Sequence, residues 1–351
     1  MRIMIAGATS AGLLMGSYAR AFEALGHEVR GLSVPEAAVA SRSPWLRLRR
    51  VPIVSRIGRD QLIVEGNRVL TTEGLRWRPD LIVTDGEGVL AGTLGTLKGA
   101  FNCRAVMIYP DPLMDLRPEI VQALPIYDLV VYACGRFGLP FFEALGARRT
   151  AFVPFAWDEA IHVRPPDDAR HAESVDVGFV GEWRPDREEW LEALAGFDVG
   201  VWGSKAWRTK AAPGSVGRRA WRGRVWGDEY VRASRQSRIT LNLVGVTNGP
   251  GLNMRAFETA GMGCFVLATR TAAQEEFFRD GEHLAYFESA EELREKVRFY
   301  LDHPDERHRI AANLAALAYQ HTYRQRAIEL LALLNDASMQ SVNGVAQPAR
   351  A

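Results

Sequence analysis

The sequence lacks the features that mark a membrane protein, a disulfide framework or a structural zinc site. No apolar run approaches the roughly 20 residues of a transmembrane helix, and the opening MRIMIAGATSAG lacks a signal-peptide core and cleavage site. The three cysteines, Cys103, Cys134 and Cys264, are widely spaced and form no CxxC pair, which is typical of a reducing compartment. These absences predict a soluble, cytoplasmic protein.

Neither sign of charge predominates. The 43 Lys and Arg face 42 Asp and Glu, for a formal net charge of +1. Proteins that bind nucleic acid through bulk charge are usually much more basic, so we expect any anion to be bound by a local patch. The 351 residues, 47% of them hydrophobic, suit two domains that each bury a core.

Several ligand-binding motifs are also missing. The chain has no D-x-D triplet and no HExxH, so we expect neither a metal ion nor another cofactor. The first loop, Gly7-Ala-Thr-Ser10-Ala-Gly12, is not GxGxxG, and the next strand ends without the acidic residue that binds an NAD ribose. A dinucleotide site is therefore not expected, and Gly7 and Ser10 are acceptor-side or purely structural residues.

Short apolar runs alternate with amphipathic stretches, which predicts βαβ units and parallel sheets. A polar stretch with Pro165 and Pro166 predicts a linker. The domains expected are 1–157, 172–321, a final helix 322–335 that returns to the first domain, and a disordered tail 336–351. Residues 61–70 are predicted to form a hairpin with a Gly-Asn turn, and 290–334 a helix broken at His303. Strands are expected near 3–6, 28–33, 80–83, 105–109, 129–132, 151–154, 175–180, 199–202, 239–244, 264–268 and 284–287.

This alternation predicts an α/β protein with two Rossmann-like, doubly wound domains facing a central cleft. Open α/β sheets bind ligands beyond the carboxyl ends of their strands, where helix amino termini favour anions. The architecture therefore favours a ligand that carries phosphate.

The most informative segment is 241–267, in which a glycine loop separates a strand from a helix expected to begin near Leu252. Gly249 and Gly251 permit positive φ and close backbone approach, so the loop can hold a diphosphate. Glu258 follows one to two turns later, where a carboxylate can accept both ribose hydroxyls. In the alternative interpretation Glu258 is a solvated helix residue, and its apolar neighbours are only core.

The chain resembles a known family through spaced motifs in its second half. Asn253-x-Arg255-x-Phe257-Glu258, Gly281-Glu-His, His303-Pro-Asp-Glu-Arg and His321-Thr-Tyr-x-x-Arg occur in the order seen in CgeB-like (spore maturation type) glycosyltransferases. These are relatives of the retaining GT-B enzymes of glycosyl transferase group 1. The resemblance covers roughly 175–334; the first half resembles the family only loosely.

The resemblance implies a GT-B enzyme that moves a sugar from a nucleoside-diphosphate sugar to an unknown acceptor, with retention of configuration. It implies that Glu258 binds the ribose. Many such enzymes carry a second glutamate eight residues earlier, where this chain has Pro250, so sugar recognition falls to other polar groups. The expected donor-binding residues are Gly181, Arg187, Lys205, Asn242, Asn248, Gly249, Gly251, Asn253 and Glu258.

Three residues are expected to be catalytic: Asp111, Arg184 and Arg255. Arg184 or Arg187 could neutralise the leaving diphosphate, or either could be a solvated residue at a helix start. On the acceptor side, Asp111 with Asp115, or Asp85 with Glu87, could orient or deprotonate a hydroxyl, or could only cap helices.

Two rival functions remain open from the sequence. A GT-B nucleotide-sugar epimerase would turn over the donor without an acceptor. A nucleic-acid-directed protein could use 205–238, which holds ten basic residues interleaved with Trp207, Trp221 and Trp226. The near-neutral net charge argues against the second.

Overall fold

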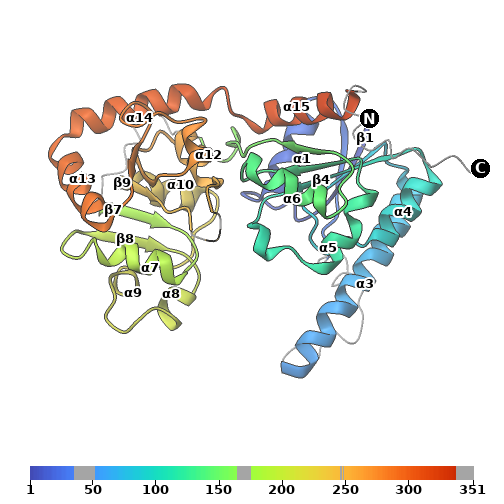
Figure 1. Ribbon diagram of the computed structural model, residues 1–351, viewed down its shortest axis with the longest axis horizontal. Helices are drawn as coiled ribbons and strands as arrows, with labels where there is room; N and C mark the ends of the chain where they lie inside the picture. The colour runs from blue at the N-terminus through green and yellow to red at the C-terminus, as the bar shows by residue number, and fades with distance from the viewer. Residues whose placement is uncertain (35–51, 164–174, 246, 248, 337–351) are drawn as a thin grey trace, which may run out of the picture. The chain divides into compact units, whose positions relative to one another are not determined.

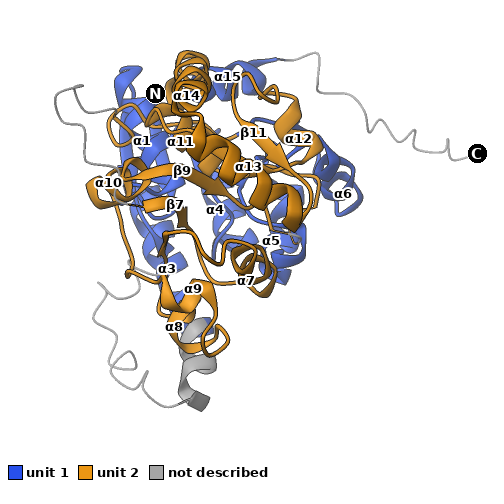
Figure 2. Ribbon diagram, turned by 90° about the vertical axis from the view of Figure 1, so that its left-hand side faces the viewer, with its two compact units in different colours: residues 1–154, 326–351 blue, residues 155–325 orange. Residues whose placement is uncertain are grey.

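The computed structural model describes residues 1–34, 52–163, 175–245, 247 and 249–336, with the side chains of 52–59 excepted (Figure 1). The chain divides into two compact units (Figure 2). Unit 1 comprises Met1–Pro154 and Arg326–Ala351, and unit 2 comprises Phe155–Gln325. The expected linker prolines, Asn248 and the expected tail from 337 onward lie outside the described residues.

Unit 1 is built on a parallel six-stranded sheet with the order β2-β1-β3-β4-β5-β6. Its strands are short apolar runs that are largely buried, as expected for a parallel sheet covered by helices on both faces, except for the exposed edge strand β2. The order changes direction between β1 and β3, because the chain pairs β2 and then β3 on opposite sides of β1. The strands are β1 (Arg2–Ala6), β2 (Glu28–Gly31), β3 (Leu81–Thr84), β4 (Arg104–Tyr109), β5 (Leu129–Tyr132) and β6 (Thr150–Phe152).

Unit 2 repeats this plan with five parallel strands in the order β11-β10-β9-β7-β8. The direction of its strand order changes between β7 and β9. The expected α/β class with two Rossmann-like domains is therefore confirmed, and each predicted strand overlaps an observed one. The strands are β7 (Val175–Val180), β8 (Val199–Trp202), β9 (Ser237–Asn242), β10 (Val266–Thr269) and β11 (Ala285–Phe287).

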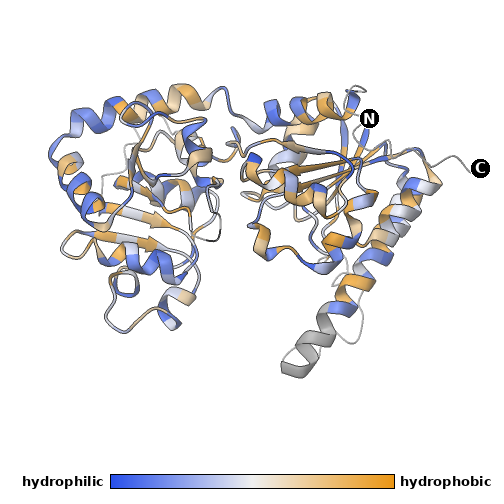
Figure 3. Cartoon of the chain, viewed as in Figure 1, coloured by the Kyte–Doolittle hydropathy of each residue, from blue (hydrophilic) through white to orange (hydrophobic). Residues whose placement is uncertain are grey.

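Helices surround both sheets, and the strands form the hydrophobic interior of each unit (Figure 3). None of the described helices is long and apolar enough to cross a membrane. The α-helices of unit 1 are α1 (Leu14–Ala24), α3 (Pro52–Trp77), α4 (Ala91–Ala100), α5 (Pro118–Ala123), α6 (Leu139–Ala144) and α15 (Tyr323–Asn335), which begins at the unit boundary. Those of unit 2 are α7 (Pro185–Glu192), α8 (Ala206–Thr209), α9 (Val216–Arg219), α10 (Asp228–Arg235), α11 (Arg255–Gly261), α12 (Ala272–Glu275), α13 (Ala290–Asp302) and α14 (Pro304–Ala318).

The predicted hairpin at 61–70 is wrong, because these residues lie inside α3. Gly66 is there for close packing: a Cβ atom on it would lie 2.1 Å from the Val34 carbonyl oxygen. Asn67 holds the helix against the next loop, since its Nδ2 donates to the Gly88 carbonyl at 2.7 Å and its Oδ1 accepts from the Leu90 amide at 3.0 Å. The Gly-Asn pair that signals a turn thus serves a tertiary contact here.

The helix expected over 290–334 is three helices. The break at His303 is confirmed, with Pro304 opening α14. A second, unpredicted break follows Ala318, where the Trp157 amide donates to the His321 carbonyl at 3.1 Å and the Tyr323 amide donates to Trp157 at 3.2 Å. Backbone groups that pair with Trp157 cannot continue the helical ladder.

The last helix, α15, packs on unit 1. The Arg104 Nη1 donates to the Leu334 carbonyl at 2.8 Å, and the Arg149 Nη2 donates to that of Leu333 at 2.7 Å. These arginines satisfy carbonyls that a helix end leaves without an intrahelical partner. Leu330 is fully buried on the same helix, whereas Ile328 is 50% exposed.

We predict that Leu330→Ala lowers the free energy of unfolding of unit 1 by about 2 to 5 kcal/mol, the cost of removing a fully buried leucine side chain. Ile328→Ala is the matched control on the exposed face and should cost well under about 1 kcal/mol. Urea denaturation followed by circular dichroism measures both. Equal effects would contradict the docking of α15 through Leu330.

Candidate functional site

The loops after β7 and β9 meet at the carboxyl end of the sheet of unit 2, where the strand order changes direction. The Arg184 Nη1 donates to the Thr247 Oγ1, joining the two loops. A Cβ atom on Gly245 would lie 3.0 Å from the Asp186 Oδ2 and 4.0 Å from the Arg184 Cδ. Such a switch point is where doubly wound sheets bind ligands.

Two arginines act on a third at this edge. Burial and the charge of Arg184, followed by that of Arg255, lower the pKa of Arg187 to about 10, although Asp186 opposes the shift. The Arg187 guanidinium lies 5.7 Å from the ring centre of Phe179, and its Nε is buried without a hydrogen-bond partner among the described residues. We call Arg184, Arg187 and Arg255 the arginine cluster. Positive charges that repel one another in this way favour an anionic ligand.

Glu258 lies in the first turn of α11 and is 1% exposed. Its Oε2 accepts from the Arg255 Nη1 at 2.5 Å and from the Tyr230 hydroxyl at 3.0 Å, and its Oε1 lies 3.7 Å from the His162 Nε2. Burial raises the pKa of this carboxyl, but Arg255, then His162 and the Tyr230 hydroxyl outweigh burial and hold the pKa below its ordinary value. The interpretation of Glu258 as a solvated helix residue is therefore wrong.

Arg255 is fixed from two sides. Its guanidinium carbon lies 4.3 Å from the ring centre of Tyr230, within cation–π range, and it pairs with Glu258 at i,i+3 on α11. Burial lowers the pKa of Arg255, but Tyr230 and Glu258 outweigh it and raise the pKa above its ordinary value. Arg255 therefore stays charged at any physiological pH.

Sequence reasoning missed His162 and Tyr230. His162 accepts from the Asp158 amide through Nδ1 at 3.0 Å, which leaves Nε2 as the protonated nitrogen facing Glu258. No motif surrounds His162, and Tyr230 lies in the segment considered for nucleic acid. Only the tertiary fold brings both to α11.

A series of hydrogen bonds between amide side chains supports the start of α11. The Asn253 Nδ2 donates to the Asn242 Oδ1 at 2.9 Å, and the Asn242 Nδ2 donates to the Gln274 Oε1 at 3.2 Å. The Asn253 Oδ1 accepts from the Ala256 amide at 3.3 Å, so the helix begins at Arg255 and not near Leu252 as predicted. Asn242 is 2% exposed and holds Asn253 in place.

The glycine loop has the expected backbone at one position. Gly249 has φ +54°, which confirms the predicted positive φ, and a Cβ atom there would meet nothing within 4 Å. Gly251 is buried, and the Pro250 carbonyl accepts from the Ala273 amide at 3.0 Å, which ties the loop to α12. Asn248, an expected sugar contact, lies outside the described residues.

Two further expected residues follow the strands of unit 2. The Gly181 carbonyl accepts from the Trp207 Nε1 at 2.8 Å, and a Cβ atom on Gly181 would lie 3.4 Å from the Arg187 Nη1. The same Cβ atom would lie only 2.6 Å from the Phe179 Cζ, so Gly181 leaves room for the Phe179 ring that contacts Arg187. Lys205 is exposed just before α8, and no described contact brings its side chain to the arginine cluster.

Unit 1 carries carboxylates at the corresponding place. A Cβ atom on Gly7 would lie 3.1 Å from the Asp85 Oδ2, so the loops after β1 and β3 meet at that switch point. Burial raises the pKa of Asp85 to about 6, with smaller contributions from Glu87 and Asp111. Asp115 and Ser10 are exposed, and no described contact links either to Asp85.

The comparisons identify the domain that carries the arginine cluster. Residues 184–332 match the family described as glycosyl transferase-like. This segment is a glycosyl transferase-like domain. The expectation of a glycosyltransferase is confirmed at this level, and the CgeB-like subtype stays a prediction. None of the curated proteins compared with the chain matches it.

Solved structures share the fold of both units of this chain. A sucrose-phosphate synthase from Thermosynechococcus elongatus is 13% identical with a TM-score of 0.66, over 95% of this chain and 98% of that one. A glycosyltransferase from Rickettsia africae is 11% identical with a TM-score of 0.63, over 97% and 99%. HepE of Anabaena, solved with UDP-glucose, is 13% identical with a TM-score of 0.61, over 95% and 99%. At these identities the likeness shows the GT-B fold.

The basic segment 205–238 does not present a row of stacking rings. Trp207 is fully buried, and the Trp221 Nε1 donates to the Gly203 carbonyl at 3.0 Å. Trp226 is 54% exposed, with the Arg224 guanidinium 5.6 Å from its ring centre. A single exposed ring makes a poor platform for single-stranded nucleic acid.

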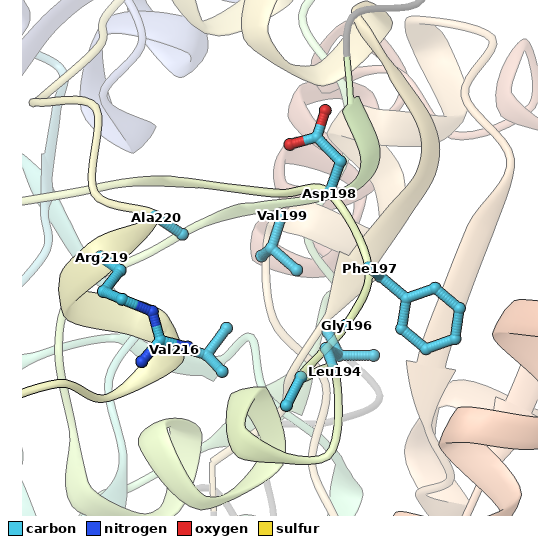
Figure 4. A pocket seen from close by; sticks show the side chains of 9 residues that line it. Leu194, Gly196, Phe197, Asp198, Val199, Val216, Arg219 and Ala220 are labelled. Carbon is cyan, nitrogen blue, oxygen red and sulfur yellow. The ribbon is translucent and has the colours of Figure 1, made fainter.

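A hollow of about 220 Å³ opens elsewhere in unit 2 (Figure 4). It is lined by residues 194–199 and by Val216, Arg219 and Ala220. Because β8 begins at Val199, these residues lie at the amino end of the strand. The hollow is therefore at the opposite edge of the sheet from the arginine cluster.

We predict that Asp85→Asn stabilises the protein at pH 7 by about 1 to 3 kcal/mol, since a buried carboxylate with a raised pKa costs about 1.4 kcal/mol per pKa unit. The folded-state pKa lies above the unfolded one, so the cost is full above about pH 6 and disappears below about pH 4.

Urea denaturation at pH 7 and pH 4 measures the difference. Asp115→Asn, on an exposed aspartate, is the matched control and should change the free energy by less than about 0.5 kcal/mol. An Asp85→Asn gain that is equal at both pH values would show that desolvation of the carboxylate is not its cause.

Proposed function

We propose that the protein transfers a sugar from a nucleoside-diphosphate sugar to an acceptor hydroxyl. The observation that carries the proposal is the arginine cluster at the switch point of a glycosyltransferase domain. Arg187, crowded by Arg184 and Arg255, gains most from an anion there. A diphosphate offers several oxygens to planar guanidinium groups, which bind phosphate in bidentate fashion.

The same cluster would support the chemical step. Negative charge develops on the diphosphate as the bond to the sugar breaks, and fixed positive groups stabilise that charge. Arg184 is held by Thr247 and Arg255 by Tyr230 and Glu258, so neither has to reorganise extensively during the reaction. Arg184 and Arg255 are therefore proposed as catalytic, with Arg187, Gly181, Gly249, Gly251 and Asn253 binding the donor.

The acceptor side is proposed at the switch point of unit 1. Asp85, with a pKa near 6, is suited to accept a proton from a hydroxyl near neutral pH, and Asp111 adds negative charge nearby. Gly7 leaves space beside the Asp85 carboxylate. The identity of the acceptor does not follow from these residues.

Finer features of the proposal come from the family resemblance and the sequence. Retention of configuration and the CgeB-like subtype depend on the motifs around Glu258. Metal independence depends on the missing D-x-D triplet. The free, buried Cys103, Cys134 and Cys264 support a cytoplasmic location. An epimerase is the rival enzyme, and it would consume the donor without any acceptor.

We predict that the protein binds UDP and UDP-glucose, the first probes because HepE of Anabaena was solved with UDP-glucose. At a hundred times the dissociation constant the ligand should stabilise the fold by about 2.7 kcal/mol, visible as a thermal shift. Arg184→Gln and Arg187→Gln should each weaken binding roughly 10- to 100-fold, the loss expected for a charged hydrogen bond.

Arg219→Gln is the matched control, since Arg219 lines the hollow at the other edge of the sheet. It should leave the affinity unchanged by calorimetry. If a GDP-, dTDP- or CDP-sugar binds and UDP-sugars do not, only the assumed nucleobase was wrong, and the proposed donor site is still supported. If none of these nucleotides binds, or if all three variants lose affinity equally, the proposed site is wrong.

We also predict that transferase activity persists in excess EDTA, because the arginine cluster supplies the positive charge that a metal ion would otherwise bring to the diphosphate. Donor consumption with and without chelator measures this. Loss of turnover that Mg²⁺ or Mn²⁺ restores would overturn metal independence and leave the donor site intact.

A further inference from the structure

We propose that Glu258 acts on the donor through Arg255, as a positioning residue that holds this guanidinium toward the diphosphate, and not as a direct ligand of the ribose. The inference rests on the proposed donor site of unit 2. It makes Arg255 the functional partner of Glu258, where the family resemblance implies the ribose.

The first observation is that the carboxylate is enclosed. The Glu258 side chain is 2% exposed, its Oε2 already accepts two hydrogen bonds, and its Oε1 faces His162 at 3.7 Å. A ribose hydroxyl that reached Oε2 would have to displace Arg255 or Tyr230, and one that reached Oε1 would have to enter beside His162. Breaking a buried charge–charge contact to make a neutral hydrogen bond is unfavourable.

The second observation is that Arg255 is the accessible member of the pair. Its side chain is 36% exposed, against 2% for Glu258. The guanidinium has five N–H donors in a rigid fork, and Glu258 occupies only its Nη1 among the described contacts. The Tyr230 hydroxyl also engages the fork, and the exposed part of the guanidinium faces away from these partners, where an anion can reach it.

The third observation is that the orientation of Arg255 is determined by its neighbours. Tyr230 lies against one face of the guanidinium, and its hydroxyl donates to the same Glu258 oxygen that accepts from Arg255. His162 packs against Tyr230 edge-on, with ring centres 6.0 Å apart. These contacts make one buried cluster in which Glu258 fixes the arginine and Tyr230 supports both.

The fourth observation links Arg255 to the other two arginines. The charge of Arg255 acts on Arg187, which places both in one electrostatic environment with Arg184. Glu258 offsets part of this positive charge, so the arginine cluster can persist when no anion is bound. Removing Glu258 should therefore disturb binding of a diphosphate even when no ribose is present.

The test compares two probes that differ in the ribose. UDP carries ribose and diphosphate, and inorganic pyrophosphate carries the phosphates alone. Calorimetry, with competition against UDP where binding is weak, gives both affinities for the wild type, Glu258→Gln, Arg255→Gln and the double variant. We expect Glu258→Gln to lower the affinities for UDP and for pyrophosphate by the same factor, about 10-fold. The double variant should be no weaker than Arg255→Gln, because Glu258 acts through that residue.

Two controls separate positioning from folding. Tyr230→Phe removes the hydroxyl but keeps the ring under Arg255, and should weaken both probes by less than Glu258→Gln does. The Arg219→Gln variant should bind both as the wild type does. Urea denaturation of each variant shows whether the fold persists, and the ratio of the two affinity losses is independent of any uniform loss of folded protein.

The outcomes are distinct. If Glu258→Gln lowers the affinity for UDP and leaves the affinity for pyrophosphate unchanged, Glu258 is a ribose ligand. The inference then fails, and the proposed donor site is still supported. Additive losses in the double variant, or wild-type protein that binds UDP but not pyrophosphate, would also overturn it. If the wild type binds no nucleotide and no pyrophosphate, the proposed function itself fails.

Discussion

A buried carboxylate organises the carboxyl-end edge of unit 2. Glu258 is nearly inaccessible, yet Arg255, Tyr230 and His162 all turn toward it. Burying a charge costs several kcal/mol unless good partners compensate it. Here compensation comes from α10, from α11 itself and from the segment before β7, so one ion pair ties together three parts of the chain. The charge of Arg255 also acts on Arg187 together with that of Arg184, and this surplus of positive charge favours an anion at the edge.

Much of the fold could be predicted because the strands of a parallel sheet appear in the sequence as short apolar runs. Strands such as β3 and β5 are uniformly apolar runs of four residues, and each was found from that property. The strand order could not be found in this way, because it depends on which side of β1 or β7 each new strand joins. The misread hairpin has the same origin: Gly66 and Asn67 serve contacts with Val34 and Leu90, distant in sequence.

The site divides along the same line. Arg184, Arg187 and Glu258 could be singled out because each follows a strand and a glycine within a recognisable local motif. The residues that contact Glu258 could not be predicted, since His162 lies in the stretch expected to be the linker and Tyr230 lies on α10, and neither is near Glu258 in sequence. The burial of Glu258 could not be predicted either, because a glutamate on an exposed helix face can have the same local sequence. Local motifs thus locate a site, while its charge balance is a tertiary property.

The two units show that this balance is independent of topology. Both change strand direction at the same point, and both place a glycine beside the charged groups there, Gly7 against Asp85 and Gly181 against Arg187. Unit 1 fills the place with carboxylates, one of which has a pKa near 6, and unit 2 fills it with arginines. An anion is disfavoured at the first and favoured at the second, while a hydroxyl that must lose a proton has the opposite preference. One fold therefore carries opposite charges at its two switch points, and the proposed transfer from a diphosphate donor to a hydroxyl acceptor would use both.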